Sequence, residues 1–297
     1  MKKLLQPNGQ KEPITIKPPA CAEGVCVYCT QNPQICKRVD VLFIMNKQLC
    51  DYPYLEKAVS LTEAFSKSRL LPYQKITGDT SDAFRLYCWN SEMSKAFYHA
   101  LHAFEIVLAN AMSEPLLRAH GPNWYEKISS YSSSNREKLS EEEIHVEKAK
   151  NRISKSGGAL NHDGIVSSVS FGFWTGLIKN EYKDALWTPH FSYFIHLDRE
   201  EAFNKIYHIK DLRNAIAHYD PIIIDAKDKT KARELFKDYK LILKLVRWIH
   251  PDSSLWIEYH SSQNFFNVWN SCPDCWKVQK LTTSNLSSNS ASHWQFK

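Results

Sequence analysis

Apolar side chains between residues 93 and 112 recur at steps of three and four, and this spacing constrains the fold more than any other feature of the chain. The positions are Met93, Ala96, Phe97, Ala100, Leu101, Phe104, Leu108, Ala111 and Met112. Because an α-helix turns once in about 3.6 residues, such steps put all these side chains on one broad face. We therefore expect a long helix that buries this face and ends near Gly121-Pro122.

The rest of the central region carries helical signals, and nothing argues convincingly for a sheet. The apolar spacing turns helical from Ser60 onward. Ser140 and Glu143 form a capping-box pattern at the start of a helix that should reach about Lys155 and end at Gly157. Further helices are expected over residues 165–177, 200–218 and 229–250; the first of these has an ambiguous period, and we favour helix because its neighbours are helical. The predicted fold is all-α, a helical bundle.

Three regions follow from composition. Residues 1–58 form an irregular N-terminal extension that contains prolines and cysteines, residues 59–260 form the helical domain, and residues 261–297 form a C-terminal extension with a flexible Ser/Asn-rich tail. A chain of 297 residues with 43% hydrophobic content can bury a sizeable core.

The start of the chain lacks the apolar run of a signal peptide, and no segment is apolar for long enough to span a membrane. We expect a cytoplasmic protein with no membrane partner. The net charge of +6 permits a polyanionic partner but argues for one only weakly.

Arg213 and His218 lie in the run Arg213-Asn214-Ala215-Ile216-Ala217-His218, which Pro221 follows closely. A guanidinium can grip a phosphate through its rigid fork of donors, and an imidazole can move a proton near neutral pH. Cleavage of RNA without a metal needs a base for the attacking 2′-hydroxyl, an acid for the leaving 5′-oxygen and a cation for the transition state. In this scheme Asn214 orients the phosphate or the imidazole. The alternative is that the Arg and His side chains only satisfy free carbonyls at a helix end.

The spacing of this element favours a homodimer. Five residues of helix correspond to about 140° of rotation and about 7.5 Å of rise, so Arg213 and His218 would not share one face of a straight helix. Two copies packed around a two-fold axis could combine both residues from both chains in one cleft, with two histidines as base and acid. Pro221 disfavours helical geometry at Asp220, which places His218 in or near the last turn. There the helix dipole favours an imidazolium, whereas burial would act in the opposite direction.

The run Leu212–Ile222 resembles the Leu-Arg-Asn-x-x-Ala-His-His-Glu-Pro signature of Abi-like proteins, a branch of the HEPN superfamily. Further blocks that look like those of this family follow one another in the same order: Ser68–Tyr73, Leu86–Asn90, Phe104–Leu108, Gly121–Tyr125, Ser170–Trp174 and Leu186–Trp187. The resemblance covers about residues 60–256.

The resemblance implies a helical bundle, a homodimer with its active cleft at the interface, and endoribonuclease activity that needs no cofactor. Members are associated with abortive infection against phage and with toxin–antitoxin pairs, so an RNA or protein antitoxin is a further expected partner beside the RNA substrate. Arg213, Asn214 and His218 match the catalytic element position by position. The family pattern suggests that Glu105 holds Arg213 or His218 across the bundle; a buried structural hydrogen-bond partner is the alternative.

The chain departs from the family pattern at four positions. The family usually has Arg where Ala109 precedes Asn110, a second His at Tyr219, Glu at Asp220 and often Arg at Ala215. Losing two guanidiniums would weaken the grip on RNA or narrow the substrate range. We expect Asn110, Tyr219 and Asp220 to support the site, with Tyr219 donating a hydrogen bond to phosphate or simply packing.

The cysteines have spacings typical of a structural zinc site. They are Cys21, Cys26, Cys29 and Cys36 near the N-terminus, and Cys272 and Cys275 in a Cys-x-x-Cys pair near the C-terminus. Either the first four bind one zinc ion, or Cys26 and Cys29 join Cys272 and Cys275; free thiols are the alternative to both.

Two functions compete with an RNA endonuclease. The first is a non-catalytic RNA-binding or protein-interaction module in which the Arg-His pair only grips RNA or supports the dimer. The second is a zinc-dependent hydrolase, against which the cysteine-only clusters argue because such a site needs an open metal with histidine or carboxylate ligands.

Overall fold

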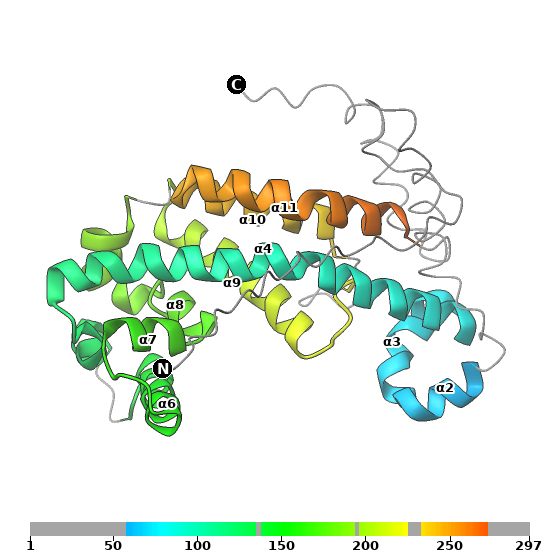
Figure 1. The fold of residues 1–297 in the computed structure, drawn as a ribbon, viewed down its shortest axis with the longest axis horizontal. Coiled ribbons are helices and arrows are strands. Elements are labelled where there is room, and N and C mark those ends of the chain that lie inside the picture. Colours follow the sequence, from blue (N-terminus) through cyan, green and yellow to red (C-terminus); the bar gives the residue numbers. More distant parts are fainter. Residues whose placement is uncertain (1–57, 135–137, 194–195, 225–232, 273–297) are drawn as a thin grey trace, which may run out of the picture. The chain divides into compact units, whose positions relative to one another are not determined.

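A computed structural model describes residues 58–134, 138–193, 196–224 and 233–272, and all of them belong to one compact unit. Every regular element among these residues is helical, which confirms the all-α prediction for the part of the chain that the structure describes (Figure 1). The elements are α2 (Ala58–Phe65), α3 (Lys67–Thr77), α4 (Thr80–His120), η3 (Trp124–Lys127), α5 (Ile128–Tyr131), α6 (Glu141–Ser156), α7 (His162–Ser168), α8 (Phe171–Gly176), η4 (Asn180–Tyr182), η5 (Lys183–Phe191), α9 (Arg199–Ala217), α10 (Leu235–Ile249) and α11 (Pro251–Asn270).

Helix α4 is the element around which the others pack. It is 41 residues long and contacts α3, α10 and α11 most extensively, with further contacts to α7, α8 and α9. The side chain of Asp79 caps its start by accepting a hydrogen bond from the Asp82 N–H. Gly121, whose φ is 81°, follows its last residue, and this confirms the predicted end.

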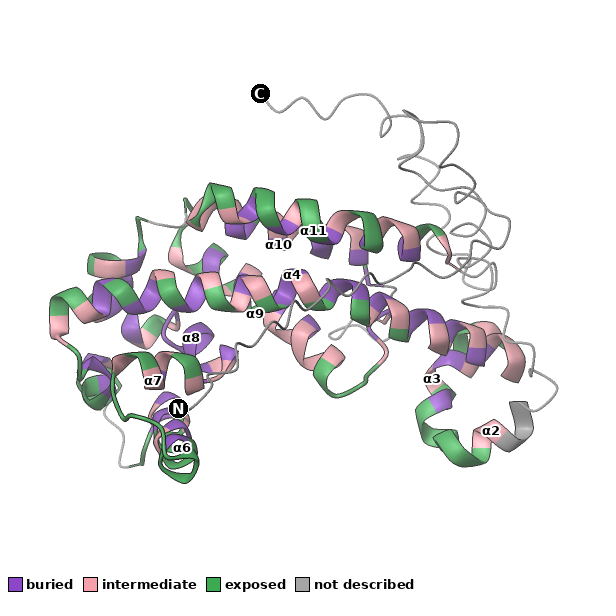
Figure 2. Cartoon of the chain, in the orientation of Figure 1, coloured by how far each residue is buried: buried purple, intermediate pink, exposed green. Residues whose placement is uncertain are grey.

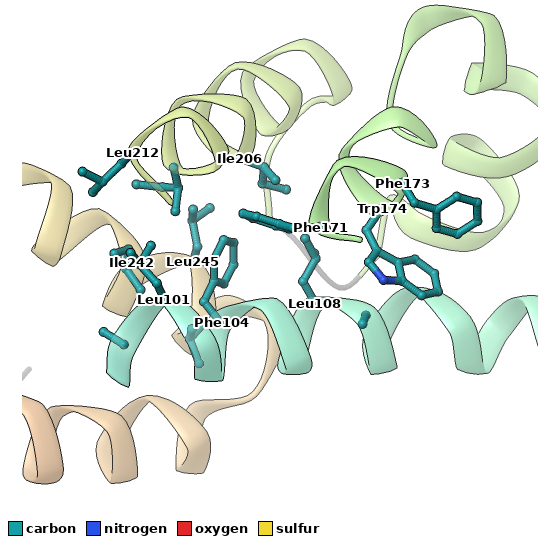
Figure 3. Close-up of a cluster of buried hydrophobic side chains, with 14 of the residues drawn as sticks. Leu101, Phe104, Leu108, Phe171, Phe173, Trp174, Ile206, Leu212, Ile242 and Leu245 are labelled. Atoms are coloured by element: carbon teal, nitrogen blue, oxygen red, sulfur yellow. The ribbon is translucent and has the colours of Figure 1, made fainter. Parts of the chain in front are cut away.

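The predicted apolar face of α4 forms the middle of the core. Figure 3 shows Leu101, Phe104 and Leu108 of α4 directed toward side chains of three other helices. These are Phe171 and Trp174 of α8, Ile206 and Leu212 of α9, and Ile242 and Leu245 of α10, all of them buried. In Figure 2 the buried side of α4 continues along most of the helix. The positions of α8, α9 and α10 relative to one another are thus set by their packing against α4 in this core.

Helices α6 to α10 follow the predictions with small differences. Ser140 and Glu143 make both hydrogen bonds of a capping box, and α6 ends before Gly157 as expected. The ambiguous segment 165–177 is helical but broken, because Val169 and Ser170 adopt extended backbone between α7 and α8. Helix α10 begins at Leu235, and residues 225–232 lie outside the described ranges.

Helix α11 crosses residue 261, where we expected the C-terminal extension to begin. It continues to Asn270, and Phe265, Val268 and Trp269 are buried against the rest of the bundle. The Trp89 Nε1–H donates to the Val268 carbonyl at 2.8 Å, which ties α4 to α11. The apolar residues here are separated by Ser, Gln and Asn, so the apolar density falls although the helical spacing persists.

Candidate functional site

The C-terminal end of α9 presents His218 to solvent. The helix ends at Ala217, and the His218 N–H donates to the Asn214 carbonyl at 2.9 Å. The Asp220 N–H then donates to the Ala215 carbonyl at 2.8 Å, so the chain turns immediately after His218. Tyr219 takes the left-handed conformation that this turn requires, with a φ of 59°. The prediction that His218 lies at the last helical turn is confirmed, and its side chain is exposed.

Two side chains from other helices hold this turn. Asn90 of α4 is buried, and its Oδ1 accepts a hydrogen bond from the Ile222 N–H at 2.9 Å while its Nδ2 reaches the Asp220 carbonyl at 3.5 Å. The Arg69 Nη1 of α3 donates to the Tyr219 carbonyl at 2.8 Å. Sequence reasoning assigned no role to either residue. The signal that could have found Asn90 is an amide on the mainly apolar buried face of α4.

Glu105 lies against Arg213. The Arg213 Nε donates to Glu105 Oε2 at 3.3 Å, and both side chains are only partly exposed. The contact joins α4 to α9 near the end of α9. Since a partly exposed pair adds little net stability, its main physical effect is to restrict the orientation of the guanidinium.

Arg213 and Asn214 line a cavity of about 640 Å³ between α6, α8 and α9, which we call the lysine pocket. Its walls also carry Lys148, Lys179, Lys210, His145, Glu141 and Ser170, together with the rings of Phe171, Phe203 and Tyr207. Burial lowers the pKa of His145, with a further contribution from nearby Lys148. The pocket is therefore a partly enclosed space with several cationic side chains.

Ile216 and Tyr219 line a different cavity, of about 570 Å³, on the side of α4. We call it the tyrosine hollow; its other walls are Tyr87, Asn90, Ser91, Ser94, Lys95, Tyr98 and His99. Tyr98 and Tyr219 are 65% and 74% exposed, so large apolar surfaces face solvent here. Burial lowers the pKa of His99, and nearby His260 and His102 lower it further.

Neither the lysine pocket nor the tyrosine hollow contains both Arg213 and His218. Arg213 lines the lysine pocket, whereas His218 belongs to neither lining and lies between residues of the two. Asp220 is exposed beside Tyr219, and Asn110 is exposed five residues after Glu105 on α4. This separation agrees with the helix geometry of the sequence element.

Five of the six predicted zinc ligands lie outside the described residues: Cys21, Cys26, Cys29, Cys36 and Cys275. Cys272 follows α11, is partly buried and packs against the core. Among the described residues, no three His, Cys, Asp or Glu side chains are grouped so that they could hold a metal ion. The zinc site therefore stays a prediction.

Comparison with known proteins identifies a family. The family model described as Abi-like protein matches residues 60–223, which is more than half of the 297-residue chain. No curated protein and no solved structure matches. Among the helices that the structure describes, none combines the length and the apolar character needed to cross a membrane.

Proposed function

Because this chain belongs to the Abi-like protein family, we propose that it is an abortive-infection effector that cleaves RNA without a metal ion, and that it is a member of the HEPN superfamily. The observation that carries the proposal is the end of α9. There an exposed imidazole, that of His218, follows one and a half turns after a guanidinium that Glu105 orients. These are the two group types that metal-free cleavage of a phosphodiester requires.

The proposed reaction is attack of an RNA 2′-oxygen on the adjacent phosphorus. One imidazole takes the proton of the 2′-hydroxyl, the bond from phosphorus to the 5′-oxygen breaks, and a second imidazole gives that oxygen a proton. The products are a 2′,3′-cyclic phosphate and a 5′-hydroxyl. Arg213 stabilises the charge that develops on the phosphoryl oxygens.

A homodimer supplies the second imidazole in this proposal. Within one chain His218 is exposed, and the cavity lined by Arg213 does not include it. The tyrosine hollow beside His218 offers apolar surface for a second copy, with Tyr98 and Tyr219 at its rim. A two-fold axis near this surface would set two His218 side chains against one RNA strand.

The direct test is incubation of the purified protein with RNA in EDTA. We expect 2′,3′-cyclic phosphate ends, and we expect His218→Ala to lower the cleavage rate by at least about a hundredfold, the lower range for loss of a general acid or base. His196→Ala is the matched control, because His196 is also exposed and has no hydrogen-bond partner among the described residues. Undiminished cleavage by His218→Ala would contradict the proposal.

The second candidate is an RNA-binding module without catalysis. It is favoured by the lysine pocket, whose cationic lining does not involve His218. In this case the wild-type protein binds RNA in a salt-dependent way, and no cyclic phosphate ends form under any condition.

A further inference from the structure

The lysine pocket contains cationic groups that its own carboxylates leave unpaired. Lys179 is paired twice, with Glu141 and with buried Glu142, at 2.8 Å in each case. Arg213 is paired with Glu105. Within the described part of the chain, Lys148 and Lys210 have no carboxylate oxygen within 4.0 Å, so the lining keeps a positive excess.

These groups lie close enough to act together. Lys148 lowers the pKa of His145 on its own helix, α6. Lys210 of α9 contributes to lowering the pKa of Glu141 of α6, so its charge acts across the pocket. The Lys210 Nζ lies 3.7 Å from the centre of the Tyr207 ring, a contact that fixes the ammonium group at the pocket wall. An anion in the pocket would therefore meet ammonium groups from both α6 and α9.

The remaining lining suits a nucleotide better than a small inorganic anion. A volume of about 640 Å³ is in the usual range for ligands of that size. Phe203 and Tyr207 provide aromatic surface, with their ring centres 5.5 Å apart. Ser170 and Asn214 add hydrogen-bonding groups, and Ser170 holds the His145 ring through a 3.1 Å hydrogen bond between its Oγ and Nδ1.

We propose that the lysine pocket binds a nucleotide of the RNA strand other than the one cleaved, with its phosphate between Lys148 and Lys210. The inference rests on the proposed function in taking RNA as the ligand. Arg213 and Asn214 lie at the boundary between this pocket and the end of α9, so a strand could pass from the pocket to His218. Lys148 and Lys210 then fix the register of the strand and take no part in the chemistry.

The test measures binding of a single-stranded RNA of about 12 nucleotides, a length within the range covered by single-strand binding domains, to protein carrying His218→Ala so that the strand stays intact. In this background Lys148→Glu with Lys210→Glu should weaken binding by at least tenfold. The plot of log affinity against log salt concentration should become less steep by about 0.7 for each phosphate that the protein no longer neutralises. The control, Lys155→Glu with Lys244→Glu, changes the net charge by the same amount at exposed lysines outside the pocket, and we expect a change of less than about threefold.

Several outcomes would overturn the inference. Equal reductions in affinity in the two double variants would mean that only the overall charge matters. If adenosine 5′-monophosphate binds as tightly as the RNA and loses affinity with the same two lysines, the pocket is a site for free nucleotides. Thermal unfolding shows whether both double variants are folded. If charge reversal prevents folding, Lys148→Gln with Lys210→Gln is used in place of the first double variant. A reduction of less than twofold in its affinity for RNA would contradict the proposal.

Failure of this inference can be told apart from failure of the proposed function. If the wild type never cuts RNA but the lysine variant still loses binding, the nuclease function is wrong and the pocket assignment stands. If the wild type cuts RNA and the lysine variant binds like its control, the pocket assignment is wrong and the nuclease function stands.

Discussion

The lysine pocket and the tyrosine hollow lie on either side of the same helix end, yet their linings differ in kind. The lysine pocket has three lysines, an arginine and a histidine around a partly enclosed space. The tyrosine hollow has one charged residue, Lys95, which pairs with Glu92 at 3.3 Å, and its other side chains are aromatic, aliphatic or small and polar. A cationic surface attracts a polyanion, whereas an exposed aromatic surface gains by covering apolar area. Under the proposed function, this helix end would bind an RNA strand on one side and a second copy of the chain on the other.

The turn after His218 lies on the side of the tyrosine hollow, where Asn90 holds it. Substitution of Asn90 should give the largest difference between the functions of the hollow and of the lysine pocket. Asn90→Ala leaves the Ile222 N–H without its acceptor in a buried position, which should lower the free energy of unfolding by about 1–3 kcal/mol. We expect RNA cleavage to fall with it, because the Asn90 amide no longer holds the turn after His218, while RNA binding by the lysine pocket persists. Urea unfolding and cleavage assays measure the two effects.

Asn204→Ala is the matched control, since Asn204 is an exposed amide on α9 with no hydrogen-bond partner among the described residues. It should change stability by less than about 0.5 kcal/mol. Loss of RNA binding in Asn90→Ala at a temperature where the protein is folded would show that the two sides are not independent.

The elements of this fold were largely predictable, because their signals are local. The spacing from Met93 to Met112 and the capping box at Ser140 each specify a helix within a few residues of sequence. The residues of the site were predictable one by one, but most of their contacts were not. Arg213 and Glu105 are 108 positions apart, and only the resemblance to the family suggested that Glu105 holds Arg213 or His218; the spacing of the residues does not show how α4 and α9 pack.

The lysine pocket could not be predicted from the sequence for the same reason. Lys148 and Lys210 lie on different helices, and each is an ordinary surface lysine in its own segment. No periodicity links them, because their proximity comes from the packing of α6 and α9 on either side of α8. The end of α11 was missed for a different reason, since Phe265 and Trp269 are separated by polar residues.

A substitution at Tyr98 tests whether the tyrosine hollow is the dimer interface, without changing the lysine pocket. If a second copy covers this surface, Tyr98→Glu places a carboxylate in the interface and should weaken self-association by at least tenfold, which is about 1.4 kcal/mol. Sedimentation at several protein concentrations measures the change, and cleavage should fall with dimer content while RNA binding by the lysine pocket stays. Leu160→Glu makes the same kind of change at an exposed apolar residue outside the hollow, and should leave association unaltered. A Tyr98→Glu protein that associates normally would remove the hollow from the proposed interface.

The smallest expected effect is a pH dependence that arises from two histidines, His145 in the lysine pocket and His99 in the tyrosine hollow. Protonation should strengthen binding at the first site and weaken it at the second. The pKa of His145 and that of His99 both lie below the usual value of 6.5, so both side chains are neutral at pH 7.5 and take up a proton only at more acidic pH. His145 faces Lys148 and Lys179, which disfavour its protonation, and Glu141 and Glu142, which favour it. The negative charge of a bound phosphate would also favour the protonated form of His145. Protonation of His145 should therefore strengthen RNA binding as the pH falls.

His99 should respond with the opposite sign. It faces His102 of α4 and His260 of α11, with the Trp256 ring 5.0 Å away, and no carboxylate contributes to its pKa. Covering His99 with a second copy disfavours its charged form further, so protonation should weaken the dimer as the pH falls below 6.5.

The change in RNA affinity and the change in dimer affinity should each stay within about tenfold, since a shift of one pKa unit corresponds to about 1.4 kcal/mol. Binding and sedimentation between pH 7.5 and 5.5 measure them, with His145→Gln and His99→Gln as the variants that should each remove one trend and keep the other. If the two trends have the same sign, or if either variant removes both, the lysine pocket and the tyrosine hollow do not serve different partners.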